Sequence, residues 1–230
     1  PTGHAYIFIQ KNAESNISVF DGANDALTTE DIDKYEYLLE NADYCLIQTE
    51  LKQRVMLHAA EIAHRHNVKV ILKPCAVTSL IPELLQNVDI LVPNIKEANA
   101  LLPEIPSLEG KARFFRAQGV KTVIITLGDK GCFLADDKQM KYFPAARITP
   151  VDTTGAADAF ISALAFYLTR GKLVEEAIKY ATCAAGLSTT RHGVPPALVD
   201  RETLELYYSE HQNDFGELHN EETSTGISEY

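Results

Sequence analysis

The chain has 230 residues, is 46% hydrophobic and carries a formal net charge of −11. This length leaves room for a sizeable core in about one to two domains, and no apolar run approaches the roughly 20 residues of a membrane-spanning helix. The acidic balance argues against DNA or RNA as the main partner, because phosphate backbones are bound by clustered Lys and Arg. It does not exclude a nucleotide held by backbone amides.

Short apolar runs alternate with amphipathic segments along the first part of the chain. AYIFIQ and NISVFDGAN, at 5–10 and 16–24, predict a pair of strands joined by a polar turn. Further on, runs rich in Val, Ile and Leu predict buried strands, and the segments between them have the 3.6-residue period of helices. We expect strands at 44–48, 68–72, 89–93 and 122–128, and helices at 28–42, 51–67, 94–102 and 108–119.

The second part of the chain is helical, with helices expected at 157–170, at 174–190 and near 200–212. Strands that alternate with helices predict an α/β fold with a parallel sheet, right-handed crossovers and helices on both faces. We expect one domain over 1–212, in which residues 1–22 form a flap outside the main sheet. The acidic, polar tail 213–230 has the composition of a disordered segment.

The cysteines and the first residue indicate the cellular location of the protein and whether a further segment precedes the chain. Cys45, Cys75, Cys132 and Cys183 lie far apart with no CxxC pair, which favours reduced thiols and a cytoplasmic protein. The chain opens on Pro1, without an initiator Met, in a segment that already has a strand pattern. We therefore expect a further segment before it.

Two loops that follow expected strands carry residues suited to a ligand, because open parallel sheets bind ligands beyond the carboxyl ends of their strands. Asn94 can cap the helix after one strand, and Glu97 lies one turn further on. The other loop has two glycines around a polar turn, whose amides can approach a phosphate. It consists of Thr126, Leu127, Gly128, Asp129, Lys130 and Gly131. Taken singly, these loops are equally compatible with a capped surface helix and a hairpin turn into CFLADD.

The segment VDTTGAADAFISAL, residues 151–164, brings small residues to the start of an apolar helix. The unpaired N–H groups of the first turn and the helix dipole favour an anion there. Gly155, Ala156 and Ala157 leave space for a phosphoryl group. Asp158 would repel that group, unless the carboxylate takes a proton from a hydroxyl that attacks the phosphorus. The segment indicates phosphoryl transfer to a hydroxyl, with an ordinary capped helix as the alternative.

In this order, the motifs PTGHAYIFI, FDGAN, QTE, NIKE, TLGDKG, DTTGAAD and TTRHG resemble the ribokinase family of carbohydrate kinases over residues 1–200. The resemblance implies a ribokinase-like three-layer α/β sandwich with a mostly parallel central sheet and a partial β lid at 1–22. It also implies ATP-dependent phosphorylation of a primary hydroxyl of a small sugar, with ribose giving ribose 5-phosphate as the expected reaction. Asp158 would be the catalytic base, 155–157 the anion hole for the γ-phosphate, and Glu50 a sugar contact.

The resemblance further implies ATP, Mg²⁺ and K⁺ as cofactors. Asn94 and Glu97 would orient the Mg²⁺–phosphate assembly through water, residues 126–131 would line the ATP site, and Thr182 would lie near the adenine. A K⁺ site of carbonyls and one carboxylate is implied at the matching positions Asp152, Thr154, Ser188, Arg191 and Gly193. The expected partners are the sugar and ATP, without nucleic acid or membrane, and a second copy of the chain bound through the lid.

The chain also departs from the family pattern. Ala157 stands where the family has Gly before the catalytic Asp, Lys73 stands where ribokinases usually carry Asn before Pro74, and Ala197 replaces a Ser at the cation site. The family's N-terminal segment, which holds the glycine-rich sugar loop and much of the lid, has no counterpart in the chain. Two alternatives therefore stay open. One is another substrate of the family, such as a nucleoside, a ketose phosphate or a keto-deoxy sugar acid; the other is a nucleotide- or sugar-binding protein that has lost catalysis.

Overall fold

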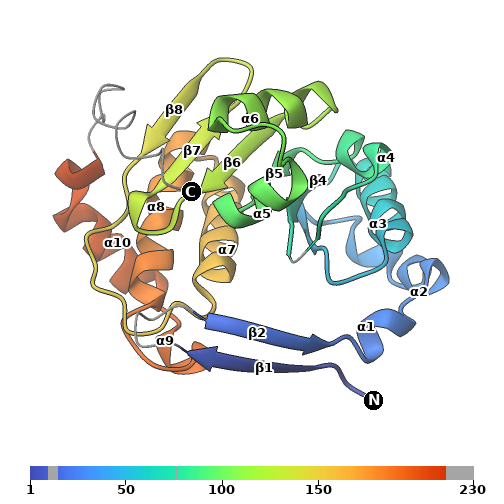
Figure 1. The fold of residues 1–230 in the computed structure, drawn as a ribbon, viewed down its shortest axis with the longest axis horizontal. Coiled ribbons are helices and arrows are strands. Elements are labelled where there is room, and N and C mark those ends of the chain that lie inside the picture. Colours follow the sequence, from blue (N-terminus) through green and yellow to red (C-terminus); the bar gives the residue numbers. More distant parts are fainter. Residues whose placement is uncertain (10–14, 76, 216–230) are drawn as a thin grey trace. The chain divides into compact units, whose positions relative to one another are not determined.

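The structure, a computed structural model, describes residues 1–9, 15–75 and 77–215 (Figure 1). Most of the tail that we expect to be disordered lies outside these residues. The described chain divides into two compact units. The first holds residues 1–8, 16–75, 77–126 and 134–140, and the second holds 9, 15, 127–133 and 141–215.

The first unit contains a run of parallel strands that confirms the expected sheet. The strands are β3 (Tyr44–Gln48), β4 (Lys69–Lys73), β5 (Ile90–Leu91) and β6 (Thr122–Thr126). They pair in parallel in this order, and β7 (Cys132–Ala135) and β8 (Met140–Phe143) follow them in the sheet. Val, Ile and Leu side chains of the inner strands, such as Ile71 and Leu91, are fully buried, which explains why the middle of these strands is apolar.

Helices connect these parallel strands. They are α3 (Gln53–Arg65), α4 (Pro82–Gln86), α5 (Ile95–Leu101) and α6 (Leu108–Ala117). The helices α1 (Ala23–Ala26) and α2 (Thr29–Lys34) and the 3-10 turn η1 (Glu36–Leu38) precede β3. The helix α3 packs on β3 and β4, while α5 and α6 pack on β6. Parallel pairing needs such crossovers, and it brings the carboxyl ends of β3 to β6 to one edge of the sheet.

The prediction of a single helix over 28–42 is wrong. A capping box between Thr28 and Asp31 starts α2, but α2 ends at Lys34 and the short turn η1 follows. Large apolar side chains beyond this point, such as Tyr37 and Leu38, are exposed, and the segment has no buried stripe to extend the helix. The helix α4 is not among the predicted elements; it begins with Pro82 in its first turn.

The expected strand pair at the start of the chain is confirmed as a separate two-stranded sheet. It consists of β1 (His4–Ile9) and β2 (Ser15–Phe20). The turn that we expect between them lies outside the described residues. Large side chains of this sheet, among them Tyr6, Phe8 and Phe20, are more than half exposed. A two-stranded ribbon is marginally stable by itself, so this apolar surface requires an account of its own.

The second unit is mostly helical, as expected for the end of the chain. It contains η2 (Gly128–Lys130), α7 (Ala156–Thr169), α8 (Val174–Ser188), α9 (Val194–Ala197), α10 (Arg201–Glu210) and η3 (Gln212–Phe215). The rings of Tyr167 on α7 and Tyr180 on α8 stack with centroids 3.9 Å apart, and Tyr208 on α10 lies 4.1 Å from Tyr180. These tyrosines join the three helices into one core. In the described part of the chain, no helix combines the length and apolar character needed to cross a membrane.

Candidate active site

The carboxyl end of β5 leads directly into a capped helix. The side chain of Asn94 accepts a hydrogen bond from the Glu97 N–H at 2.8 Å, and the Glu97 carboxylate accepts one from the Asn94 N–H at 2.7 Å. This reciprocal capping box fixes both side chains at the start of α5. Asn94 also bridges to Thr126 at the end of β6, whose N–H donates to the Pro93 carbonyl at 2.9 Å. The expected cap at Asn94 is confirmed.

The Glu97 carboxylate has a partner that the sequence analysis does not predict. Lys73, the last residue of β4, donates from Nζ to both carboxylate oxygens of Glu97. It also donates to the Pro74 carbonyl at 2.7 Å. The side chains of Lys73 and Glu97 are 5% and 14% exposed. The sequence does carry a sign of this pair, because β4 and β5 are adjacent parallel strands and a lysine at the end of one needs an anion nearby when it is buried.

Glu50 lies in the irregular segment just after β3 and is exposed. The residue before it, Thr49, is buried, and its hydroxyl donates to the Cys75 carbonyl at 2.8 Å. This bond ties the end of β3 to the segment after β4. Glu50, Lys73, Asn94 and Thr126 therefore follow or end adjacent parallel strands at one edge of the sheet. The first unit brings its expected site residues to the place where such sheets bind ligands.

In the second unit, residues 127–131 form a tight turn that leads into β7. The Leu127 N–H donates to the Gly131 carbonyl at 2.7 Å, and η2 lies between them. Gly131 has a φ of +93°, and a Cβ placed on it would lie 1.9 Å from the Phe143 carbonyl oxygen. Gly128 also has a positive φ, but open space surrounds it. Only the second glycine is thus required by packing, and the strand expected to reach residue 128 ends at Thr126 because the chain turns here.

A buried carboxylate organises the segment before α7. Asp152 accepts hydrogen bonds from the backbone N–H groups of Thr154 at 2.9 Å and of Gly193 at 3.0 Å. The bond from Gly193, and then that from Thr154, lower the pKa of Asp152. The Asp152 N–H donates in turn to the Thr189 carbonyl. The hydroxyl oxygen of Thr154 is buried, and its contact with the Asp152 carboxylate also lowers the pKa of that group.

The helix α7 begins at Ala156, one residue before the expected start. Gly155 precedes it with a φ of +83°, and a Cβ there would lie 3.3 Å from the Val194 side chain. A left-handed backbone and this close neighbour together favour glycine. Ala157 and Asp158 are exposed in the first turn, whereas the Ala156 N–H donates to the Thr153 carbonyl at 3.2 Å. A ligand can therefore reach the carboxylate and the small side chain beside it.

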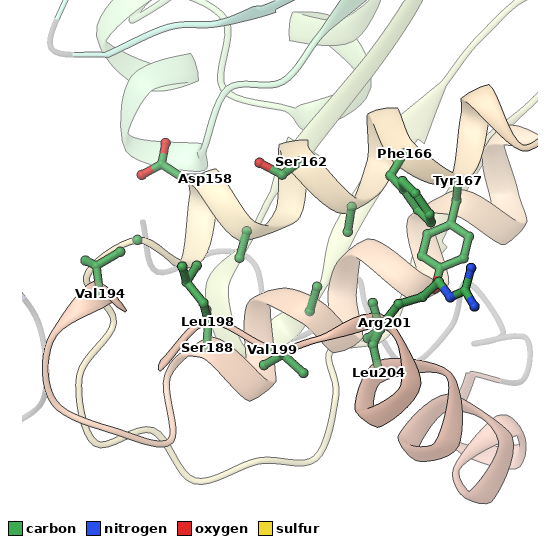
Figure 2. Close-up of a pocket in the computed structure, with 14 residues that line it drawn as sticks. Asp158, Ser162, Phe166, Tyr167, Ser188, Val194, Leu198, Val199, Arg201 and Leu204 are labelled. Carbon is green, nitrogen blue, oxygen red and sulfur yellow. The ribbon is translucent and has the colours of Figure 1, made fainter. Parts of the chain in front are cut away.

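A pocket of about 400 Å³ opens beside this turn (Figure 2). Asp158 lies at one end of it, with Ser162 one turn further along α7. Leu198 and Leu204, from the segments around α9 and α10, line the opposite side. Most of the lining is apolar, and Asp158 and Ser162 are polar residues within it. Ser162 is not among the predicted site residues, although its spacing of four residues from Asp158 places both on one helical face.

The remaining expected residues lie in or after α8. Thr182 is buried, and its hydroxyl oxygen has no hydrogen-bond partner among the described residues. Ser188 is also buried and donates to the Ala185 carbonyl at 2.8 Å. Arg191 is exposed and donates to the Pro196 carbonyl at 3.2 Å. The second unit therefore joins Asp152, Thr154 and Gly193 by hydrogen bonds, while the polar groups of Ser188 and Arg191 bond to other carbonyls.

Comparisons with known proteins show the family of the chain. The family described as pfkB family carbohydrate kinase matches residues 1–200. The chain belongs to this family. It is 33% identical over 202 residues to a ribokinase of Staphylococcus aureus, covering 86% of this chain and 66% of the relative. It is 32% identical over 213 residues to a deoxyribokinase of Salmonella typhimurium, covering 90% and 70%. The chain thus spans about two thirds of the length of these relatives.

Solved structures of ribokinases confirm the fold. A crystal structure of a ribokinase from Thermotoga maritima is 38% identical with a TM-score of 0.83, and the match covers 91% of this chain and 70% of that one. An Arabidopsis thaliana ribokinase complexed with ribose and ATP is 30% identical with a TM-score of 0.81, and the match covers 90% and 69%. The prediction of a ribokinase-like α/β sandwich with a mostly parallel sheet, which follows from the motifs, is confirmed.

Proposed function

We propose that the protein is an ATP-dependent sugar kinase that transfers the γ-phosphate to a primary hydroxyl of a small sugar, with ribose giving ribose 5-phosphate. The observation that carries this proposal is the exposed carboxylate of Asp158 in the first turn of α7, beside the left-handed Gly155. Membership of a carbohydrate kinase family and likeness to proteins named ribokinase support the same reaction.

In this reaction Asp158 accepts the proton of the attacking hydroxyl. Its exposure lets a sugar hydroxyl come within hydrogen-bonding distance, which a general base requires. The N–H groups at the start of α7 stabilise the negative charge on the transferred phosphoryl oxygens. Glu50, exposed at the end of β3, is proposed to contact the sugar.

ATP and Mg²⁺ are proposed to bind together. In the described part of the chain, no cluster of three or more His, Cys, Asp or Glu could hold a metal. Mg²⁺ commonly binds through substrate phosphates, waters and one or two carboxylates, and it would supply charge neutralisation of the phosphates. Glu97 would hold a metal-bound water through lone pairs that Lys73 leaves open, with Asn94 beside it. Residues 127–131 would lie along the nucleotide, and the unpartnered hydroxyl of Thr182 suits a polar group of the base.

The K⁺ site is proposed around Asp152. A buried, ionised carboxylate and the buried hydroxyl oxygen of Thr154 beside it suit a weakly hydrated cation. Gly193 would hold the loop closed through its bond to Asp152, and carbonyl oxygens near Ser188 and Arg191 would complete the shell. Bound K⁺ would be structural and shape the anion hole.

Two further proposals concern the whole protein. A homodimer through β1 and β2 would cover the exposed Tyr6, Phe8 and Phe20, because contiguous apolar patches commonly mark interaction sites. A cytoplasmic location suits the cysteines, since Cys45, Cys75, Cys132 and Cys183 are all free thiols.

The test is sugar-dependent release of ADP from ATP. Ribose and 2-deoxyribose should be compared at equal concentrations, because the Salmonella relative named deoxyribokinase makes 2-deoxyribose the second candidate substrate. We expect ribose to give the highest kcat/KM, and NMR of the product should place the phosphate on the primary hydroxyl. Heat of nucleotide binding without ADP release for any sugar would instead identify a binding protein. The Asp158→Asn variant is the control for contaminating kinases.

A further inference from the structure

Lys73 is a buried lysine whose hydrogen-bonding capacity is fully used. An ammonium group has three N–H donors, and Nζ of Lys73 donates to both carboxylate oxygens of Glu97 and to the Pro74 carbonyl. The residue is 4% exposed. Lys73 therefore has no donor left for a phosphate, and reaching one would require breaking its bonds to Glu97 or Pro74.

The ion pair between Lys73 and Glu97 cancels the negative charge that Glu97 would present to an approaching cation. A carboxylate that carries a full negative charge at the end of β5 would attract a divalent cation, whereas a carboxylate paired with an ammonium group has a net charge of zero. The Asn94 N–H takes up one more lone pair of Glu97. Glu97 can therefore still accept a hydrogen bond from a water, but it does not attract the metal over long range.

We infer that Lys73 is a positioning residue that neutralises Glu97 and thereby sets the Mg²⁺ concentration at which the nucleotide binds. The inference rests on the proposed function, because it places the Mg²⁺–nucleotide next to α5. In this chain the lysine weakens the recruitment of Mg²⁺ and holds Glu97 in a fixed orientation. The neutral Asn that ribokinases usually carry at this position would leave the carboxylate charged.

The inference predicts opposite effects for the two partners. The readout is the Mg²⁺ concentration that gives half-maximal binding of β,γ-imido-ATP, measured by isothermal titration calorimetry without sugar. Lys73→Met should lower this concentration about tenfold, because a unit change of charge a few Å from a divalent ion has that effect even in a water-like dielectric. Glu97→Gln should raise it about tenfold, because it leaves the lysine unpaired.

The double variant Lys73→Met/Glu97→Gln decides between explanations. It replaces one neutral pair with another, so its Mg²⁺ requirement should return to within about twofold of the parent's. If Glu97 attracts Mg²⁺ by its own charge, the double variant will be as weak as Glu97→Gln, and the inference is overturned. A purely structural lysine would leave Lys73→Met at the parent's value, which also overturns it.

Separate control experiments test whether each variant folds and whether the proposed function holds. Breaking a buried ion pair destabilises a protein, so each variant is first checked by its melting temperature, and Lys73→Asn serves if Lys73→Met does not fold. The calorimetric readout involves no turnover. If the variants shift the Mg²⁺ requirement as predicted but no sugar is phosphorylated, the proposed function alone is wrong. If sugar is phosphorylated normally but the variants do not shift the Mg²⁺ requirement as predicted, the role of Lys73 alone is wrong.

Discussion

The carboxylate of Asp152 accepts a hydrogen bond from the backbone N–H of Gly193, 41 residues later in the chain and 3.0 Å away. A second bond, from the N–H of Thr154, reaches the other carboxylate oxygen. One buried side chain thus joins the segment that starts α7 to the loop that follows α8. Both bonds are strongest when Asp152 is ionised, and they lower its pKa.

The first prediction is a pH-dependent loss of stability in Asp152→Asn. At pH 7 the free energy of unfolding should fall by about 1.5–3 kcal/mol, as for other hydrogen bonds to charged groups. The folded pKa lies below the unfolded value of about 3.9. The stabilisation is therefore complete above that value and is lost as the pH falls toward the folded pKa. Urea denaturation at pH 7 and pH 3 measures this, with the exposed Asp137→Asn as control. A difference that persists undiminished at pH 3 would contradict the assignment.

A second prediction concerns monovalent cations. If Asp152 and Thr154 hold K⁺, the rate of sugar phosphorylation should rise with K⁺ and respond weakly to Na⁺, because a cage of oxygens discriminates ions by fit and field strength. Asp152→Asn should remove the response. The measurement is the initial rate at constant ionic strength, with tetramethylammonium as the replacement ion. Equal rates in K⁺-free buffer would remove this site from the mechanism.

Asp158→Asn tests the catalytic base. The amide keeps the size of the side chain but does not accept the proton, so kcat should fall by about 10²–10⁴. The affinity for ATP should hold or improve slightly, because a negative charge near the γ-phosphate has been removed. Steady-state kinetics and calorimetry with ATP measure the two effects. Retention of most of the activity would reduce Asp158 to an ordinary carboxylate at the start of a helix.

Ala157→Gly tests the departure beside this base. If the methyl group crowds the transferred phosphoryl group, glycine should raise kcat, although glycine in a helix costs about 0.5–1 kcal/mol of stability relative to alanine. Ala159→Gly, two residues further into α7, carries a similar helix penalty and controls for it. An unchanged kcat in Ala157→Gly, with only a lower melting temperature, would mean that the methyl group is accommodated.

The two glycines of the turn 127–131 should differ sharply in the stability that is lost when each is replaced by alanine. Gly131→Ala places a Cβ 1.9 Å from the Phe143 carbonyl oxygen, so the backbone must move and the protein should lose well over 2 kcal/mol of stability. Gly128→Ala meets no atom within 4 Å, and it should cost only about 1–2 kcal/mol for its left-handed backbone. Chemical denaturation of both variants provides the comparison. Equal losses would mean that the turn relaxes around residue 131.

The sequence predicts those parts of the fold that depend on neighbours in the chain. The apolar runs of β3, β4 and β6 and the period of α3 are local patterns, and the cap at Asn94 is a local exchange of hydrogen bonds. The start of α7 follows from Gly155 for the same reason. The family order of the motifs then supplies the site residues, because it relates positions that no local pattern connects. The domain boundary at 212 stays a prediction.

Features that depend on contacts between residues far apart in the chain could not be predicted from local sequence patterns. The 3.6-residue period over 28–42 looks helical, but the side chains beyond Lys34 find no core to pack against. Lys73 meets Glu97 only because β4 and β5 are adjacent, and no pattern within either segment requires an ion pair. The bond from Gly193 to Asp152 likewise spans 41 residues. In each case the deciding contact is tertiary.

The stack of Tyr167 on Tyr180 has a consequence for spectroscopy. The chain contains no tryptophan and ten tyrosines, so its near-ultraviolet absorption and fluorescence come mainly from phenol rings. Two of these rings lie nearly parallel, at 12°, with centroids 3.9 Å apart. Their electronic transitions couple at this separation and give a circular dichroism band that depends on how α7 and α8 are packed. The protein therefore carries its own optical reporter on the helix whose first turn holds Asp158, and no label is needed to follow it.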